Sequence, residues 1–428
     1  MKRVVSFLLS LILPFSAPVF AGAENAPVRP LRVLDAWWAA EAYQTAYPDR
    51  TVETIERAWD ELGNSDEEAI IRSGDWDAAC IDTMNYSLSE LTRLGLTLEL
   101  DFCGPAMAAS EGLYPSIRRG CSVGGKLVAL PAGHLGTLVC GYRLAGTDYQ
   151  GAEDAEGVMV RDRLGFSAEE QPTTFAEVCE LGLRYLALDP KIRKGSSFLY
   201  SSAGGQGRLL LDQMMKMYIA EAADESGGID FDTQAFRAAL ENAAPLLEAF
   251  EADAKRARGG GVGGRPLLEE STGVLASCRL PQITEGASFP AHMSVVIVNP
   301  NSARLAEAVD FAVTASGCGE STLPLLLYEN ADYDALLKQS YDDLIAAQIA
   351  QGEDASVIEE LEARKAAGDD KYFTPRSVVM RYAEEVAPFL CFPRYRSFPT
   401  DEAIDDYLRG KTDEDGFIAA LNEQARKN

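Results

Sequence analysis

Short apolar runs alternate with helical patterns along the first hundred residues of the chain. The predicted strands are 31–34, 51–55 and 76–81, and the predicted helices are 37–46, a segment that starts at Ser65, and 88–94. Each strand is a brief run of apolar or β-branched residues bounded by turn residues. Ser87, with Glu90 three residues later, is a capping box that marks a helix start. This alternation predicts a parallel α/β sheet with helices on its faces.

The rest of the chain continues the alternation and then becomes helical. Gly124-Gly125 predicts a hairpin turn into a strand at 126–130, which Pro131 ends. Further predicted strands are 138–142 and 294–298. Further predicted helices begin after Thr174 and after Ser302, and two more cover 209–223 and 235–257. A glycine-rich loop is predicted at 258–265. Apolar residues at helical spacing predict that nearly everything from Tyr333 to the C-terminus is helix.

The first residues have the pattern of a secretory signal peptide. Lys2 and Arg3 supply the positive region, residues 4–20 the apolar stretch, and Ala21-Gly22-Ala23 a small-residue cleavage site. No cysteine follows that site, so the pattern does not predict a lipoprotein anchor. We therefore expect an exported protein, periplasmic or extracellular, that is soluble after cleavage near Ala23.

Composition and charge narrow the function classes. The 428 residues carry 66 acidic and 39 basic side chains, a formal net charge of −27, and no basic stripe interrupts the acidic excess. Nucleic acid and anionic membranes are poor candidate partners, because binding phosphate depends on clustered lysine and arginine. The eight cysteines include no CxxC pair and do not predict a zinc site. Among them, Cys80 and Cys179 lie in apolar or helical patterns and are interpreted as small buried hydrophobic residues.

Catalytic and cofactor motifs are scarce. His134 and His292 are the two histidines, and we interpret both as structural. The chain has no GxSxG or HExxH motif and no phosphate-binding Gly-Lys-Ser/Thr loop. Gly259, Gly261 and Gly264 match GxGxxG, but a helical pattern precedes them where a dinucleotide site needs a strand. We therefore predict no catalytic residue, no cofactor and no metal.

Aromatic and polar side chains gather where the first three predicted strands end. They are Trp37, Trp38, Trp59, Asp82 and Asn85. Ligands bind outside the carboxyl ends of strands in open α/β sheets, so we expect these residues to line one crevice. Aromatic rings beside amide and carboxylate groups suit a sugar or another small polar solute. At most one of the adjacent rings of Trp37 and Trp38 can point squarely inward, and core packing of this pair is the alternative.

A series of short motifs runs through most of the chain. They are Tyr47-Pro48, Ser73-Gly74-Asp75-Trp76-Asp77, Leu91-Thr92-Arg93-Leu94-Gly95, Gly124-Gly125-Lys126 with Ala129-Leu130-Pro131, Pro172-Thr173-Thr174-Phe175-Ala176-Glu177, Val298-Asn299-Pro300-Asn301-Ser302, and Tyr407-Leu408-Arg409-Gly410-Lys411 followed by Phe417. In this order they resemble the extracellular solute-binding proteins of ABC importers, family 1, the group that includes bacterial sugar binders. The chain departs from that pattern at Phe175, where the family usually has tryptophan, and in the length of its helical segment at 330–390.

The resemblance implies a two-lobed α/β fold of the periplasmic-binding-protein type II, each lobe a mostly parallel sheet flanked by helices, with an extended helical C-terminal region. The expected ranges are 1–23 for the signal peptide, 24–138 plus 295–325 for the first lobe, and 139–294 plus 326–428 for the second. Chain crossings between the lobes are expected near 131–142, 285–297 and 318–330.

The implied function is to capture a small polar solute, above all a carbohydrate, and to deliver it to the permease subunits of an ABC transporter. The lobes close on the ligand about a hinge that we place at Leu130-Pro131 and the loop with Gly133 and Gly136. Such a protein is not an enzyme, and we expect a monomer.

From the second lobe, Tyr142, Tyr200 and Ser201 are expected to face the ligand. Tyr142 ends a predicted strand next to the hinge, and the other two residues precede the Gly204-Gly205 turn, where backbone can approach a ligand closely. Two other functions stay open. One is an exported hydrolase such as a glycosidase, whose pair of carboxylates no spacing singles out. The other is a surface interaction protein that uses the helical region after residue 330.

Overall fold

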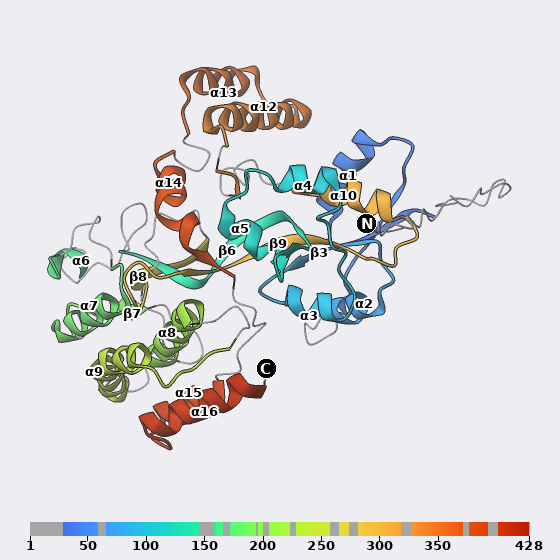
Figure 1. Cartoon of the computed structure of the whole chain (residues 1–428). Helices are drawn as coiled ribbons and strands as arrows, with labels where there is room; N and C mark the ends of the chain where they lie inside the picture. The colour runs from blue at the N-terminus through green and yellow to red at the C-terminus, as the bar shows by residue number, and fades with distance from the viewer. Residues whose placement is uncertain are drawn as a thin grey trace, which may run out of the picture.

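Figure 1 shows the computed structural model of the chain. The structure describes residues 29–58, 66–144, 158, 160–165, 172–193, 196–199, 205–222, 228–256, 265–273, 281–317, 327–329, 331–370, 376–392 and 401–427. The predicted signal peptide and the glycine-rich segment 258–264 lie outside the described residues. Within these ranges, no helix is both long enough and apolar enough to cross a membrane.

The first elements follow the predicted order of strands and helices. They are β1 (Leu31–Leu34), α1 (Trp37–Ala46), β2 (Val52–Ile55), α2 (Glu67–Ser73), β3 (Ala78–Asp82) and α3 (Leu88–Arg93). β1 lies between β2 and β3 and pairs with both in parallel, so the three strands end at one edge of the sheet. The predicted Ser87 cap is confirmed, because its side chain accepts a hydrogen bond from the backbone N–H of Glu90.

A short hairpin precedes the long strand β6. The elements are α4 (Gly104–Ser110), α5 (Pro115–Gly120), β4 (Ser122–Val123), β5 (Lys126–Leu127) and β6 (Leu130–Leu144). Gly124 and Gly125 have φ of 59° and 77° and form the predicted turn between β4 and β5. The prediction that Pro131 ends a strand is wrong, because β6 runs through it. The pairing of β6 with its neighbour is irregular between Pro131 and Leu135, and such a bulge tolerates a residue without an N–H.

One mixed sheet joins the two halves of the molecule. Its other strands are β7 (Ser196–Leu199), β8 (Arg265–Gly273), β9 (Phe289–Val298) and β10 (Leu390–Cys391). The order is β2-β1-β3-β9-β6-β8-β7, with β10 beside β9. β9 is antiparallel to both β3 and β6, and β6 is antiparallel to β8. β6 and β9 therefore carry the chain between the halves at two of the predicted crossings, whereas residues 318–326 of the third lie outside the described residues.

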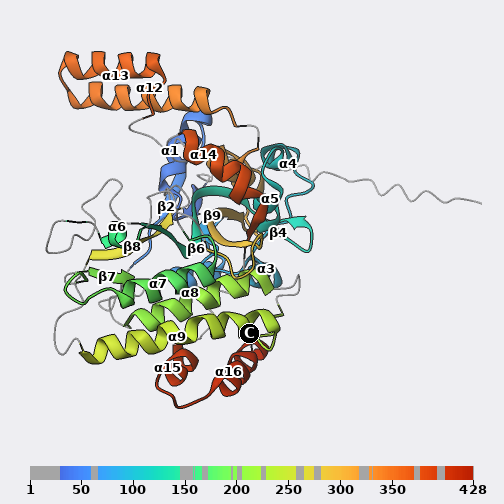
Figure 2. The same ribbon diagram turned by 90° about the vertical axis from the view of Figure 1, so that its left-hand side faces the viewer.

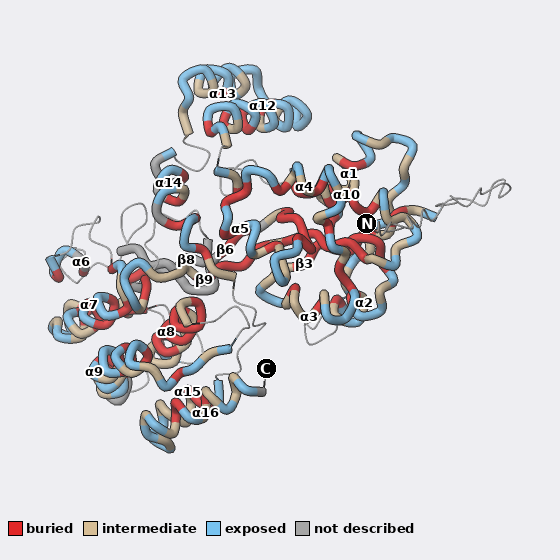
Figure 3. Tube along the Cα trace, viewed as in Figure 1, coloured by how far each residue is buried: buried red, intermediate tan, exposed pale blue. Residues whose placement is uncertain are grey.

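Helices cover the sheet and bury two separate hydrophobic clusters (Figures 1 and 3). The first cluster packs β1, β3, β9 and α10 (Leu305–Gly317) together with Tyr43, Trp76 and Phe311. The second packs Phe198, Phe236 and Phe417 among the helices α6 (Val160–Arg163), α7 (Phe175–Ala187), α8 (Gly205–Ala222), α9 (Gln234–Arg256), α15 (Asp401–Leu408) and α16 (Glu414–Lys427). These clusters are the cores of a first and a second lobe. The predicted helix cap at Thr174 is confirmed as a complete capping box with Glu177.

A pair of helices stands away from both lobes (Figures 1 and 2). α12 (Tyr333–Gln351) and α13 (Ala355–Ala367) bury a small cluster of their own around Tyr341, and Val379 of α14 (Arg376–Arg381) joins it. A π-helical turn (Tyr382–Val386) and a 3₁₀ turn (Ala387–Phe389) then lead into β10. The helical character predicted for this region agrees with the structure.

The last hundred residues pack against both hydrophobic clusters. Leu327, Tyr382 and Leu390 belong to the first cluster. Ile404, in contrast, belongs to the second cluster. Helical periodicity shows which face of a helix is apolar and does not show which core that face meets. The lobe ranges stay a prediction.

Candidate functional site

The residues that follow β1, β2 and β3 form one edge of the sheet, which we call the carboxyl edge (residues 35–38, 56–58 and 82–86). Asp35 follows β1, Arg57 follows β2, and Asp82 is the last residue of β3. Since the three strands are parallel, these side chains come from segments that lie next to one another. This is the edge at which ligands bind in open α/β sheets.

Arg57 joins two carboxylates at the carboxyl edge. Its Nε lies 2.6 Å from Oδ2 of Asp35, and its Nη1 lies 2.9 Å from Oε2 of Glu67, the first residue of α2. Glu67 is buried and also accepts a hydrogen bond from the Tyr86 hydroxyl. Burial raises the pKa of the Glu67 carboxyl, and the Arg57 charge opposes that shift. Burial likewise raises the pKa of Asp35, and the Arg57 charge lowers it. The guanidinium thus compensates the charge of partly buried carboxylates.

Asp82 is held by a histidine from the neighbouring antiparallel strand. His292 of β9 is buried, and its Nδ1 lies 2.9 and 3.2 Å from the two carboxylate oxygens of Asp82. The backbone of β9 also supports the next residue, because the Met293 N–H donates to the Thr83 hydroxyl at 2.9 Å. His292, for which the sequence predicts a structural role, therefore positions a predicted site residue.

The two tryptophans at the start of α1 lie in different environments. Trp37 is 73% exposed, whereas Trp38 is half-buried and packs against the first cluster. Ala36 is the N-cap residue of α1 and supplies no side-chain hydrogen bond to the helix. The start of this helix therefore offers an exposed aromatic ring and backbone N–H groups that its N-cap residue does not cap.

Cys80 lies just below the carboxyl edge, in the middle of β3. Its thiol is buried, and burial together with the charges of Asp35, Asp82 and Glu67 raises its pKa to about 12. This confirms the interpretation of Cys80 as a small buried residue, and Cys179 is likewise buried and free. No cluster of metal-ligating side chains occurs in the part of the chain that the structure describes.

The structure describes two of the remaining predicted site residues, Asn85 and Tyr142. Asn85 is exposed and lines a cavity of about 10 Å³ with Glu68 and Arg72, a space for no more than one water. Tyr142 lies in β6, where its backbone pairs with Glu270 of β8. Trp59, Tyr200 and Ser201 lie outside the described residues.

Asp35, Arg57 and Glu67 are not among the site residues that the sequence predicts. A signal for the first two was present, because each follows a predicted strand in the same way as Asp82. A signal for Glu67 was absent, since its contact with Arg57 depends on how α2 packs.

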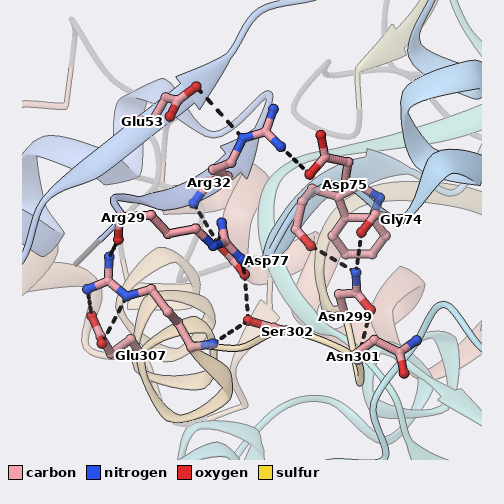
Figure 4. A network of polar contacts seen from close by, with 12 residues as sticks. Arg29, Arg32, Glu53, Gly74, Asp75, Asp77, Asn299, Asn301, Ser302 and Glu307 are labelled. Atoms are coloured by element: carbon pink, nitrogen blue, oxygen red, sulfur yellow. Dashed lines mark hydrogen bonds and ion pairs between the residues drawn. The ribbon is translucent and has the colours of Figure 1, made fainter. Parts of the chain in front are cut away.

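The opposite edge of the same strands, which we call the amino edge (residues 29–32, 74–77 and 299–304), holds a closed polar network (Figure 4). Asp77 is fully buried and accepts hydrogen bonds from the Arg29 guanidinium at 2.8 and 3.0 Å, from the Arg32 N–H at 2.8 Å and from the Ser302 hydroxyl. The Asn299 side chain donates to the carbonyls of Gly74 and Trp76. Two of the motifs that carry the family resemblance, 73–77 and 298–302, therefore meet here.

Comparison with protein-family models and with curated protein sequences finds no match. Solved structures, in contrast, match over nearly the whole chain. A sugar transporter protein of Rhizobium etli in an open conformation is 16% identical, with a TM-score of 0.55 over 93% of this chain and 99% of that one. The cyclic alpha-maltosyl-1,6-maltose binding protein of Arthrobacter globiformis is 15% identical, with a TM-score of 0.55 over 94% of this chain and 100% of that one.

A third similar structure is the GacH receptor of Streptomyces glaucescens, solved without ligand and with acarbose. It is 14% identical, with a TM-score of 0.52 over 93% of this chain and 97% of that one. Similarity at this identity establishes the fold. The chain therefore has the periplasmic-binding-protein-like fold of ABC sugar-binding proteins, as the motifs implied, with a mixed sheet flanked by helices.

Proposed function

We propose that this protein is the exported substrate-binding protein of an ABC importer and that it binds a carbohydrate at the carboxyl edge. The observation that carries the proposal is the fold, which this chain shares over at least 93% of its length with the sugar-binding proteins described above. The amino-terminal signal-peptide pattern supports an exported location. The permease subunits are the partner that this function requires.

The side chains of the carboxyl edge support a carbohydrate as the ligand. A sugar hydroxyl both donates and accepts hydrogen bonds, and the C–H face of a sugar ring stacks on aromatic rings. The edge offers carboxylate acceptors at Asp35 and Asp82, donors at Arg57 and at the uncapped start of α1, and the exposed ring of Trp37. These are the complementary groups for a neutral polyol.

Binding would close the second lobe over the carboxyl edge. β6 and β9 connect the lobes, and β6 contains the proposed hinge residues Gly133 and Gly136 next to the irregularity in its pairing. In this mechanism Tyr142, Tyr200 and Ser201 approach the ligand from the second lobe, and Trp59 and Asn85 join Trp37 and Asp82 from the first, whereas Trp38 packs against the first cluster. The permease then recognises the closed form.

A thermal-shift screen tests the proposal. The probes are maltotriose, acarbose, D-tagatose and cycloalternan, with amino acids and polyamines as the comparison set. A ligand at 100 times its Kd adds about 2.7 kcal/mol of stability, a shift that is easily detected. We expect a carbohydrate to stabilise the protein and to be recovered intact by chromatography. Stabilisation by amino acids alone would contradict the carbohydrate assignment, and hydrolysis of the probe would identify an enzyme instead.

A further inference from the structure

Asp35 has a left-handed backbone conformation, which aspartate adopts more often than most residues with a Cβ but still at a cost. Its φ is 55°, and it is the one non-glycine residue with positive φ in the described ranges. This left-handed region is costly for a residue with a Cβ and is most often occupied by glycine. Leu34 and Ala36 on either side are fully buried, so the strand before and the helix after hold Asp35 in place.

The Asp35 carboxylate is only partly used within the protein. One oxygen, Oδ2, pairs with Arg57 at 2.6 Å, and within the described part of the chain the structure gives the other oxygen no partner. The side chain is 20% exposed, so part of it can be reached from solvent. A carboxylate has about four acceptor positions, and the pair with Arg57 uses only some of those of Asp35.

Arg57, in turn, is anchored by a buried carboxylate, that of Glu67. Its second partner, Glu67, has a side chain that is 8% exposed and is bonded to Tyr86 as well. Arg57 therefore cannot turn away from the sheet without leaving a buried carboxylate unpaired, which is unfavourable. Tyr86, Glu67, Arg57 and Asp35 thus form one series of contacts, which holds the Asp35 carboxylate at a defined place at the carboxyl edge.

We propose that Asp35 is the specificity-determining acceptor for the hydroxyl groups of the ligand and that Arg57, anchored on Glu67, is its positioning residue. The inference rests on the proposed carbohydrate function. Three carboxylates (Asp35, Glu67 and Asp82) lie around Cys80, with Arg57 and His292 as their cationic or polar partners. The edge therefore favours neutral sugars, whose hydroxyls donate to a carboxylate, over sugar acids, whose charge it repels.

If Asp35 had a purely structural role, replacing it would lower the stability of the protein. The Asp35 to Arg57 pair is partly exposed, and pairs of that kind contribute little to stability. A strained backbone conformation at such a residue is retained where function needs the side chain. Asp35→Gly should therefore leave the melting temperature unchanged or raise it, because glycine adopts this φ without cost and Arg57 keeps Glu67.

The experiment combines melting temperatures with calorimetric Kd values. The probes are maltotriose and two matched pairs, D-glucose with D-glucuronate and D-galactose with D-galacturonate. We expect Asp35→Gly and Asp35→Asn to weaken binding of the neutral probe by about 10- to 100-fold, the range for a hydrogen bond to a charged group. Asp35→Asn should also reduce the preference for the neutral member of a pair, which a merely structural residue would not affect.

A matched control is available elsewhere in the first lobe. Asp310 of α10 forms a pair with Arg50 at 2.7 Å, and both side chains are 29% exposed. Asp310→Asn should leave Kd unchanged. Unchanged affinity in Asp35→Gly, or a melting temperature that falls further than in Asp310→Asn, would overturn the inference. If the native protein binds none of these probes and none of the carbohydrates of the thermal-shift screen, the proposed function itself is contradicted, and the melting temperature of Asp35→Gly still tests the strain.

The positioning role of Arg57 is tested by a double-mutant cycle. Arg57 holds the two carboxylates with two different nitrogens of a rigid planar group, Nε and Nη1, whereas a lysine ammonium is a single point charge. Arg57→Lys should therefore weaken binding of the neutral probe. Because it acts through Asp35, Arg57→Lys should cause little further loss when Asp35→Asn is already present. Losses that add in the double variant would show that Arg57 does not act through Asp35.

Discussion

The two edges of the three parallel strands contain the same kind of ion pair in two different settings. At the amino edge, Asp77 is fully buried and bonds to Arg29, to the Arg32 backbone and to Ser302. At the carboxyl edge, Asp35 bonds to Arg57 through one oxygen, is 20% exposed and has a strained backbone. Both oxygens of the Asp77 carboxylate have hydrogen-bond partners within the protein, whereas the Asp35 carboxylate is paired through one oxygen.

This difference separates stability from binding along a single sheet. A buried carboxylate with a full set of partners holds β1, β3 and the start of α10 together and has no capacity for a ligand. A partly exposed carboxylate with an available oxygen contributes little to stability and can accept hydrogen bonds from another molecule. Substitutions at the two edges should therefore have opposite profiles.

The largest expected effect is on stability at the amino edge. Asp77→Ala removes a fully buried carboxylate that accepts several hydrogen bonds and should cost about 3 kcal/mol in the free energy of unfolding, measured by urea titration. Asp75→Ala is the control, because Asp75 is paired with Arg32 but is 75% exposed, and it should change stability little. Equal losses in the two variants would show that burial at this edge does not matter.

The next effect is on binding at the carboxyl edge. Trp37→Ala should weaken carbohydrate binding by about 2 kcal/mol, as expected for an aromatic residue that contacts a ligand. Because Trp37 is 73% exposed, the unfolding free energy should stay nearly the same. Trp38→Ala should instead reduce stability, because its ring packs on the first cluster. Calorimetry and denaturant titration on both variants check this, and the reverse pattern would move the site away from α1.

A smaller effect concerns the pH dependence of stability. The pKa of Glu67 is raised in the folded protein, so the folded state binds the Glu67 proton more tightly than the unfolded state does. The resulting contribution to the free energy of unfolding is fully present below the unfolded pKa of about 4.3. That contribution is lost as the pH rises through the higher folded pKa. Relative to Glu67→Gln, the native protein should therefore lose stability as the pH rises from about 4.3. Unfolding curves measured from pH 4 to pH 8 test this, and parallel curves would contradict it.

The smallest effect is a difference in thiol reactivity. Burial raises the pKa of both Cys80 and Cys179 to about 12, so neither thiol should react with iodoacetamide at pH 8 in the folded protein. Cys103 is less buried and should react faster. Peptide mapping after labelling, with a sample unfolded in urea as the control, checks the order. Rapid labelling of Cys80 would mean that solvent reaches beneath the carboxyl edge.

Local features of the fold were predictable because their causes lie within a few residues. Ser87 and Thr174 cap helices through the backbone three residues later, and Gly124-Gly125 forms a hairpin turn that needs positive φ. Pro131 misled the prediction because its effect on a strand depends on the neighbouring strand, where a bulge accommodates it. Parallel and antiparallel pairing likewise depends on which strands become neighbours.

The sequence by itself determined the α/β class, most of the helices and strands, and the place of Asp82 and Trp37 at the ends of strands. The tertiary structure alone decided which side chains meet: Asp82 with His292, which is 210 residues away, and Asp77 with Ser302, which is 225 residues away. It also decided that Arg57 joins Asp35 to Glu67. The reason is physical, since periodicity and capping act over one or two turns of chain, whereas these contacts depend on the packing of separate elements on one sheet.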